Sequence, residues 1–193
     1  MKINGFYNKS ILPALLMFPM VNLGLTFWEY NSGNPTITNT DVSLFLEEAA
    51  LLIFVAIAEE LFFRGLLLCE LLFSFQVNPI LAGTIVSALF GALHLINVFS
   101  YASLSYAIVQ SMCAFAISFD LSAIYYKFKS IVPCIVIHAL INITSIGLDN
   151  GLEKLSLNSF EATVFLIVAV LYLVYGYRLF SVKQFCIDKG EDE

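Results

Sequence analysis

The sequence predicts an all-α membrane protein, a polytopic bundle of about six transmembrane helices. Two features of the composition lead to this prediction: 60% of the 193 residues are hydrophobic, and only 12% are charged. The mean hydropathy is accordingly high, at +0.87. A water-soluble domain has about a quarter of its residues charged, so this chain has too little charge to cover a surface that faces water. Lipid must surround most of it, which excludes a soluble domain.

Six apolar segments supply the predicted helices. They are residues 11–28, 44–75, 80–98, 102–126, 131–148 and 160–180. A spanning helix takes about 20 residues, so six spans with short loops leave one membrane domain over residues 1–193. The first segment is longer than the apolar part of a secretory signal and lacks a clear small-x-small cleavage site. We therefore expect it to be an uncleaved span.

Turn-forming and basic residues separate these segments. Residues 31–40 are rich in Gly, Pro, Asn and Thr, Asn78-Pro79 precedes the third segment, and Lys127 and Lys129 follow the fourth. The second segment is too long to cross a bilayer perpendicularly, because a helix from 44 to 75 would be about 48 Å long. Whether it tilts or leaves the bilayer, its polar centre at Glu59-Glu60 comes near the membrane interior.

Basic residues predict the orientation. With the N-terminus inside, only Lys154 falls on the outer side, and most of the other basic residues lie in the cytoplasm. These are Lys2, Lys9, Lys127, Lys129, Arg178, Lys183 and Lys189. By the positive-inside rule both termini are cytoplasmic, and we expect an integral protein of the plasma membrane.

A few ionisable residues lie inside the apolar segments: Glu59, Glu60, Arg64, His94, Asp120 and His138. Each costs about 3 kcal/mol on insertion scales, and such residues usually mark function. The chain has only two histidines, and both lie within predicted spans. This concentration is the strongest indication of a functional site in the composition.

Helical geometry separates the two adjacent glutamates. Glu60 and Arg64 are four residues apart, so they share a helix face and can form an ion pair. Glu59 points about 100° away. We therefore expect Glu60 and Arg64 to be a scaffold pair, with Glu59 facing another partner. Asp120 could pair with Arg64 across helices, but we favour the simpler expectation that it approaches the cytoplasmic interface.

The remaining polar residues suggest amide-bond hydrolysis. His138 and Asn142 project from one face of the fifth segment, because they are also four residues apart. A carboxylate and a histidine can deprotonate a water held between them, and a second histidine with an amide can stabilise an oxyanion. Two histidines and a glutamate also make a catalytic zinc site, with Glu59, His94 and His138 as ligands. The residues leave both versions open.

Three short motifs carry a resemblance to a known family. Residues 59–65 read EELFFRG, residues 90–94 read FGALH, and residues 138–142 read HALIN. In this order and within apolar segments, they resemble the EExxxRG, FxxxH and HxxxN motifs of the type II CAAX prenyl endopeptidases. That family comprises the Ras-converting enzyme and its bacterial relatives, also called CPBP or Abi proteins. The resemblance covers about residues 44–148.

The resemblance implies an intramembrane endopeptidase that depends on a glutamate-activated water. It implies that Glu59 and His94 activate the water and that His138 and Asn142 form the oxyanion hole. Glu60 and Arg64 would hold the helices in place, in agreement with the geometric argument. No cofactor is implied, with zinc as the secondary alternative.

Partners and rival functions follow from the same features. The expected partners are a hydrophobic or lipidated peptide substrate and membrane lipids, such as a prenylated C-terminus or a bacteriocin precursor. Nothing in the chain is basic enough for nucleic acid. One rival is a non-enzymatic immunity protein that captures a bacteriocin in the membrane. Another is a proton-coupled transporter, which would be expected to show repeated halves; no internal repeat stands out.

Overall fold

The computed structural model describes residues 12–31, 42–100, 102–146 and 157–181, and this part of the chain is helical with no strand. Its six α-helices fall one in each predicted apolar segment, so the predicted all-α fold is confirmed. They are α1 (Leu12–Asn31), α2 (Val42–Glu60), α3 (Pro79–His94), α4 (Leu104–Phe128), α5 (Val132–Ser145) and α6 (Ser159–Ser181). Helix α5 is shorter than its segment, and residues 147 and 148 lie outside the described part.

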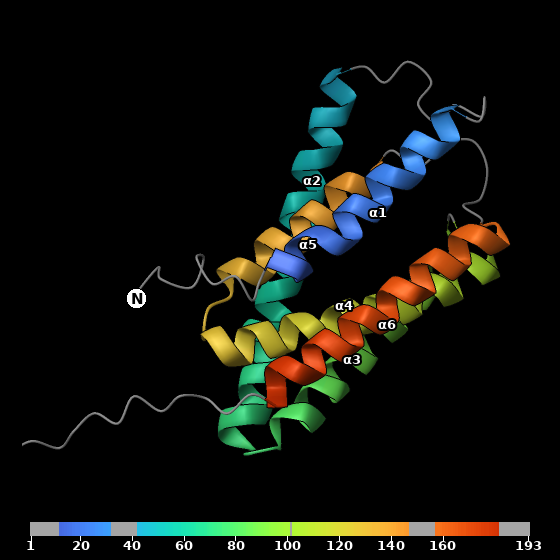
Figure 1. Cartoon of the computed structure of the whole chain (residues 1–193). Helices are drawn as coiled ribbons and strands as arrows, with labels where there is room; N and C mark the ends of the chain where they lie inside the picture. The colour runs from blue at the N-terminus through green and yellow to red at the C-terminus, as the bar shows by residue number, and fades with distance from the viewer. Residues whose placement is uncertain (1–11, 32–41, 101, 147–156, 182–193) are drawn as a thin grey trace, which may run out of the picture.

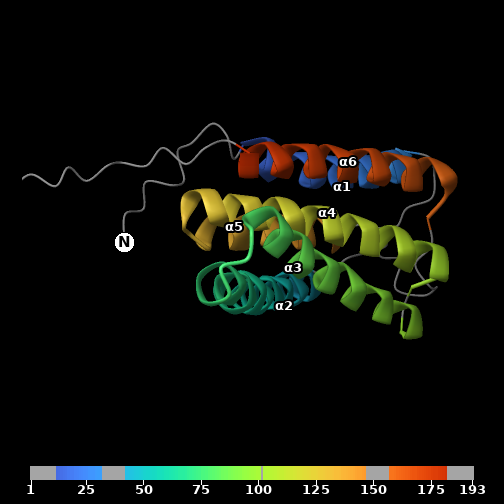
Figure 2. The same cartoon turned by 90° about the horizontal axis from the view of Figure 1, so that it is seen from below.

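The helices form three layers of two (Figure 2): α1 with α6, α5 with α4, and α2 with α3. Helix α4 packs against α3 and α6, while α5 packs against α1 and α2. Successive helices run in opposite directions, so the start of α1 and the end of α6 lie at the same end of the bundle (Figure 1). The middle layer, α4 and α5, therefore lies between the other two.

The outer surface is apolar enough to face lipid. Three helical stretches are long and apolar enough to cross a bilayer, at Pro79–Phe99, Leu104–Phe128 and Ser159–Ser181. Large apolar side chains are exposed on the other helices as well; Phe54 on α2 is 70% exposed. Exposed apolar surface of this extent is typical of a membrane protein rather than of a soluble monomer.

The second predicted segment is helical almost throughout, but its hydrogen bonding changes at the acidic pair. It is α-helical up to Glu60 and π-helical over Leu61–Leu68 and Glu70–Ser74. The helical stretch therefore covers most of the predicted 44–75. π-Helical turns are rare and occur frequently at functional sites, and this one begins directly after Glu59 and Glu60.

Two of the predicted breaks coincide with helix caps, whereas the break at residues 31–40 lies, apart from its first residue, outside the described part of the chain. Asn78 caps α3, since its Oδ1 accepts hydrogen bonds from the amides of Ile80 (3.0 Å) and Leu81 (3.5 Å). Lys129 ends α4 in the left-handed conformation, with φ 53°. Its ammonium lies 4.3 Å from the ring centroid of Tyr126, and partial burial lowers the pKa of this ammonium group.

Glycines let α3 and α6 approach the central helix α4. A Cβ on Gly91 of α3 would lie 2.8 Å from the carbonyl oxygen of Ser111, and one on Gly176 of α6 would lie 2.9 Å from Cα of Asp120. The Ser111 hydroxyl also donates a hydrogen bond to the Gly91 carbonyl at 2.7 Å. Small residues of this kind are typical of helix interfaces in membranes.

We predict that Gly91→Ala destabilises the protein. Its methyl group would collide with backbone atoms of α4, at a cost of about 1–3 kcal/mol. Gly24→Ala is the matched control, because a Cβ at Gly24 meets no atom within 4 Å. Thermal unfolding in detergent should show a lower melting temperature for Gly91→Ala and an unchanged or higher one for Gly24→Ala. Equal melting temperatures would contradict the close approach of α3 and α4.

Candidate active site

The acidic pair at the end of α2 begins a buried network. The Oε1 atom of Glu60 accepts a hydrogen bond from Nη1 of Arg64 at 2.8 Å, and both side chains are fully buried. The pairing predicted from the four-residue spacing is therefore present. Both residues come from one helical stretch, Glu60 at the end of α2 and Arg64 in the π-helical turn that follows it.

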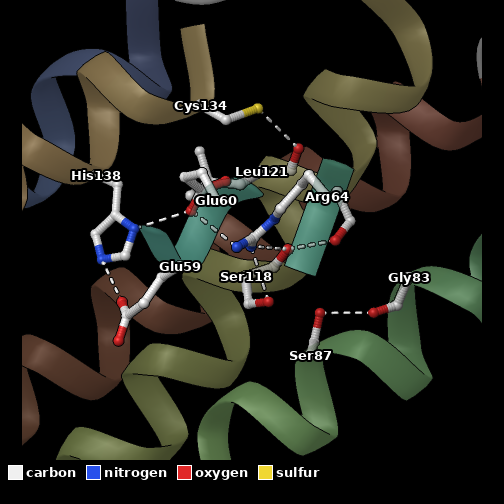
Figure 3. Close-up of polar contacts among 10 residues, drawn as sticks. Glu59, Glu60, Arg64, Gly83, Ser87, Ser118, Leu121, Cys134 and His138 are labelled. Carbon is white, nitrogen blue, oxygen red and sulfur yellow. Dashed lines mark hydrogen bonds and ion pairs between the residues drawn. The ribbon is translucent and has the colours of Figure 1, made fainter. Parts of the chain in front are cut away.

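Arg64 also joins this stretch to α4 and α3. Its Nη2 donates to the carbonyl oxygen of Ser118 at 2.9 Å and to the Ser118 hydroxyl at 2.8 Å. Its guanidinium carbon lies 5.4 Å from the ring centroid of Phe90 on α3. Figure 3 shows the Arg64 side chain between Glu60 and Ser118. Arg64 therefore connects the π-helical turn to two other helices.

His138 of α5 lies between the two glutamates (Figure 3). Its Nδ1 is 2.9 Å from Oε1 of Glu60, and its Nε2 is 3.4 Å from Oε2 of Glu59. The Glu60 oxygen already accepts from Arg64, so we assign Nδ1 of His138 as the donor in this contact. The sequence predicted only the Arg64 partner of Glu60. The structure adds a direct contact between Glu60 and a predicted catalytic residue.

His94 is the last residue of α3, and one of its ring nitrogens is hydrogen-bonded within the helix. Its Nδ1 lies 2.9 Å from the carbonyl oxygen of Phe90. A carbonyl oxygen can only accept, so Nδ1 carries a proton, and in the neutral ring Nε2 is the nitrogen with the lone pair. The Phe90 ring packs against both imidazoles, with centroid distances of 4.8 Å to His94 and 5.7 Å to His138. Phe90 therefore fixes the orientation of His94 through its carbonyl group and lies beside His138.

Two adjoining cavities border these side chains. The first, which we call the acidic cavity, has a volume of about 290 Å³ and is lined by Leu52, Val55, Glu59, Leu93, His94, Asn97, Gln110, His138, Asn142 and Ser145. All four residues predicted to be catalytic lie on it: Glu59 from α2, His94 from α3, and His138 and Asn142 from α5. The structure thus brings together residues that are far apart in the sequence.

The second cavity is mainly apolar. It has a volume of about 140 Å³, and we call it the aromatic cavity because Phe18, Phe90 and Phe165 are among its lining residues. His94, Gln110, His138, Asn142 and Ser145 line both cavities. Polar groups that could act on a peptide bond therefore adjoin a space suited to apolar groups.

Comparison with protein-family models shows which family this chain belongs to. The model of the family described as type II CAAX prenyl endopeptidase Rce1-like matches residues 41–144, which is more than half of the chain. The chain belongs to this family. The matched region of this Rce1-like protein contains all three motifs and runs from α2 almost to the end of α5. No curated protein and no solved structure matches the chain. Family membership, together with the apolar helices, identifies an integral membrane protein of a protease family.

Asp120 does not make the ion pair with Arg64 that the sequence allowed. It is fully buried, and neither carboxylate oxygen has a hydrogen-bond partner in the described part of the protein. Arg64 bonds to Ser118 instead, and Asp120 is covered, because Gly176 allows α6 to pack directly over it. The expected ion pair with Arg64 is therefore absent from the described residues, whereas the approach to the cytoplasmic interface stays a prediction, because burial between helices does not fix the depth of Asp120 in the bilayer.

The zinc alternative calls for three ligands around one point. Within the described residues, no three His, Cys, Asp or Glu side chains are close enough together to hold a metal ion. Glu59 is near Nε2 of His138, whereas His94 is held to its own helix through Phe90. Glu59, His94 and His138 are therefore not grouped around one point in the described part of the structure.

Two polar residues of α4 contribute to the site although the sequence did not predict them there. Ser118 holds Arg64, and Gln110 lines both cavities. Both lie within an apolar span and belong to none of the three motifs. Their polarity inside a span was the available signal, but the direction in which each points depends on how α4 is rotated in the bundle.

We predict that Arg64→Ala strongly destabilises the protein. It leaves the buried Glu60 carboxylate without its main positive partner, which typically costs about 3–5 kcal/mol. The double variant Glu60→Ala/Arg64→Ala should recover a large part of this loss, because it removes the unpaired charge. Ser118→Ala, which removes one of the three hydrogen bonds of Arg64, is the milder control. Thermal unfolding in detergent measures these variants together with Glu60→Ala and wild type. A loss in the double variant equal to the sum of the two single losses would contradict a direct ion pair.

Proposed function

We propose that this Rce1-like protein hydrolyses a peptide bond in a hydrophobic or lipidated peptide at the membrane, using a water activated by Glu59 and His94. The observation that carries the proposal is the acidic cavity, which Glu59, His94, His138 and Asn142 all line. Peptide hydrolysis inside a bilayer needs a polar, water-accessible space that lipid does not fill. A cavity of about 290 Å³ has room for several water molecules.

Glu59 is the acidic residue suited to act as general base. Its side chain is 34% exposed, whereas that of Glu60 is fully buried and occupied by Arg64 and His138. The free Nε2 of His94 is a second acceptor on the same cavity. A water between them would lose its proton as it attacks the carbonyl carbon, and that proton would then pass to the leaving amine.

His138 and Asn142 are suited to stabilise the oxyanion. They lie one turn apart on α5 and both line the acidic cavity. In its doubly protonated form, which has both carboxylates as acceptors within 3.4 Å, the imidazole of His138 donates from Nε2 as well as from Nδ1. Because the separation of 3.4 Å from Glu59 is long for a hydrogen bond, Nε2 can turn its proton to a developing oxyanion. The amide of Asn142 would be the second donor.

The substrate class follows from the surroundings of the cavity. The aromatic cavity adjoins the same histidines and would accept an apolar side chain or lipid group. We further propose that the protein lies in the plasma membrane. Both termini would be cytoplasmic, because Lys127, Lys129 and Arg178 lie at the C-terminal ends of α4 and α6, at the same end of the bundle as the start of α1. Membrane lipids would be its other partners, and the site needs no cofactor in this scheme.

We predict that Glu59→Ala and His94→Ala each lower peptide cleavage at least 100-fold, the usual minimum contribution of a general base. Purified protein in detergent would be incubated with a panel of prenylated and unprenylated peptides, and the products measured by mass spectrometry. Glu70→Ala is the control, because Glu70 is an exposed glutamate that follows in the same helical stretch and lines neither cavity. Wild-type rates in both site variants would contradict the assignment of the base.

The same assay separates the two versions of water activation. Without a metal, a chelator such as 1,10-phenanthroline should leave the wild-type rate unchanged. Complete loss of activity with recovery on addition of zinc would instead assign Glu59, His94 and His138 as metal ligands.

A further inference from the structure

Two amide side chains outside the catalytic set face each other on the acidic cavity. Asn97 lies in the 3₁₀ turn Leu95–Phe99 that follows His94, and Gln110 lies on α4. The Nδ2 of Asn97 donates to Oε1 of Gln110 at 2.8 Å. Both residues line the acidic cavity, and Gln110 also lines the aromatic cavity. The pair is therefore next to Glu59, His94, His138 and Asn142, where a substrate would lie.

The contact between the two amides leaves hydrogen-bonding capacity on both sides. A primary amide has one oxygen acceptor and two N–H donors. Within the described residues, the side-chain oxygen of Asn97 and the side-chain nitrogen of Gln110 make no other hydrogen bond. If the oxygen and nitrogen of both amides were interchanged, Gln110 would donate to Asn97. One amide oxygen and one NH₂ group would still lie outside the contact between the two side chains. The pair offers one acceptor and one donor in either case.

We propose that Asn97 and Gln110 bind the main chain of the peptide substrate beside the bond that is cleaved. A residue of an extended peptide presents one N–H donor and one C=O acceptor, which is the complement of what the pair offers. This inference rests on the proposed peptidase function. It identifies the pair as positioning residues that recognise the backbone and not a particular side chain. Because Gln110 borders both cavities, a bound segment extends from the acidic cavity to the aromatic one.

The neighbouring contacts hold the pair in place before substrate arrives. The Ser111 hydroxyl donates to the carbonyl oxygen of Gly91 at 2.7 Å, which fixes α4 against α3 directly beside Gln110. The carbonyl oxygen of Asn97 accepts from the amides of Ser100 (3.1 Å) and Ala102 (3.0 Å), which fixes the turn. Preorganised donors and acceptors lose less entropy on binding than mobile ones.

The test compares a cleavable peptide with its ester analogues. Replacing one peptide bond near the cleaved bond by an ester removes a single N–H donor. For the wild type, one such replacement should raise KM about fivefold to tenfold, the effect of one lost hydrogen bond. Gln110→Met and Asn97→Leu should raise KM for the parent peptide by a similar factor with little change in kcat. In Asn97→Leu, which lacks the acceptor for this N–H, the same ester should cause no further loss, whereas in Gln110→Met the ester should still raise KM.

Control variants and outcomes make the test decisive. Ser87→Ala removes a buried hydroxyl that lines neither cavity and, among the described residues, bonds only to the Gly83 carbonyl of its own helix, so its KM should match that of wild type. Thermal unfolding identifies a variant that fails to fold. Gln110→Glu then takes the place of Gln110→Met, because the glutamate carboxylate still accepts from Asn97 but has no N–H donor. If wild type cleaves the peptide and the variants have the same KM, the inference is overturned but the proposed function is not. The same holds if the ester raises KM equally in all proteins. No cleavage of any peptide by wild type overturns the proposed function and the inference together.

Discussion

The buried carboxylate of Glu60 is the constraint on which the rest of the site depends. A negative charge inside a membrane bundle is stable only with positive partners at hydrogen-bonding distance. Its Oε1 has one such partner, Arg64 from the π-helical turn, and it also accepts a hydrogen bond from Nδ1 of His138 on α5. Arg64 in turn bonds to Ser118 of α4. One carboxylate oxygen thus fixes the relative positions of α2, α5 and α4.

This constraint also determines which glutamate is available for chemistry. Because Glu60 is held in the interior, the residue before it on the same helix turns to a different side, where Glu59 meets the acidic cavity and Nε2 of His138. The adjacent acidic pair therefore divides into a fully buried member and a partly exposed one. The scheme we propose uses this division, since a general base must be reachable by water while its neighbour keeps the imidazole oriented.

Much of this arrangement could be predicted from the sequence, because it depends on local periodicity. Hydropathy gave the six helices, and the four-residue spacing gave the Glu60–Arg64 pair. The contact between Glu60 and His138 could not be predicted, since it depends on the relative rotation of two helices that are distant in the chain. The same reason applies to the pairing of Asn97 with Gln110 and to the burial of Asp120 under Gly176. The change to π-helical bonding after Glu60 also had no signal in the apolar pattern.

The most direct test of the central claim is ¹⁵N NMR of the histidine side chains in the intact protein. The chain has only two histidines, so labelled imidazole signals can be assigned with a single His94→Gln variant. The account predicts that Nδ1 of His138 carries a hydrogen-bonded proton, and that its signal shifts clearly in Glu60→Gln but little in the control Glu70→Gln. An unprotonated Nδ1, or a His138 signal that is the same in wild type and Glu60→Gln, would contradict it.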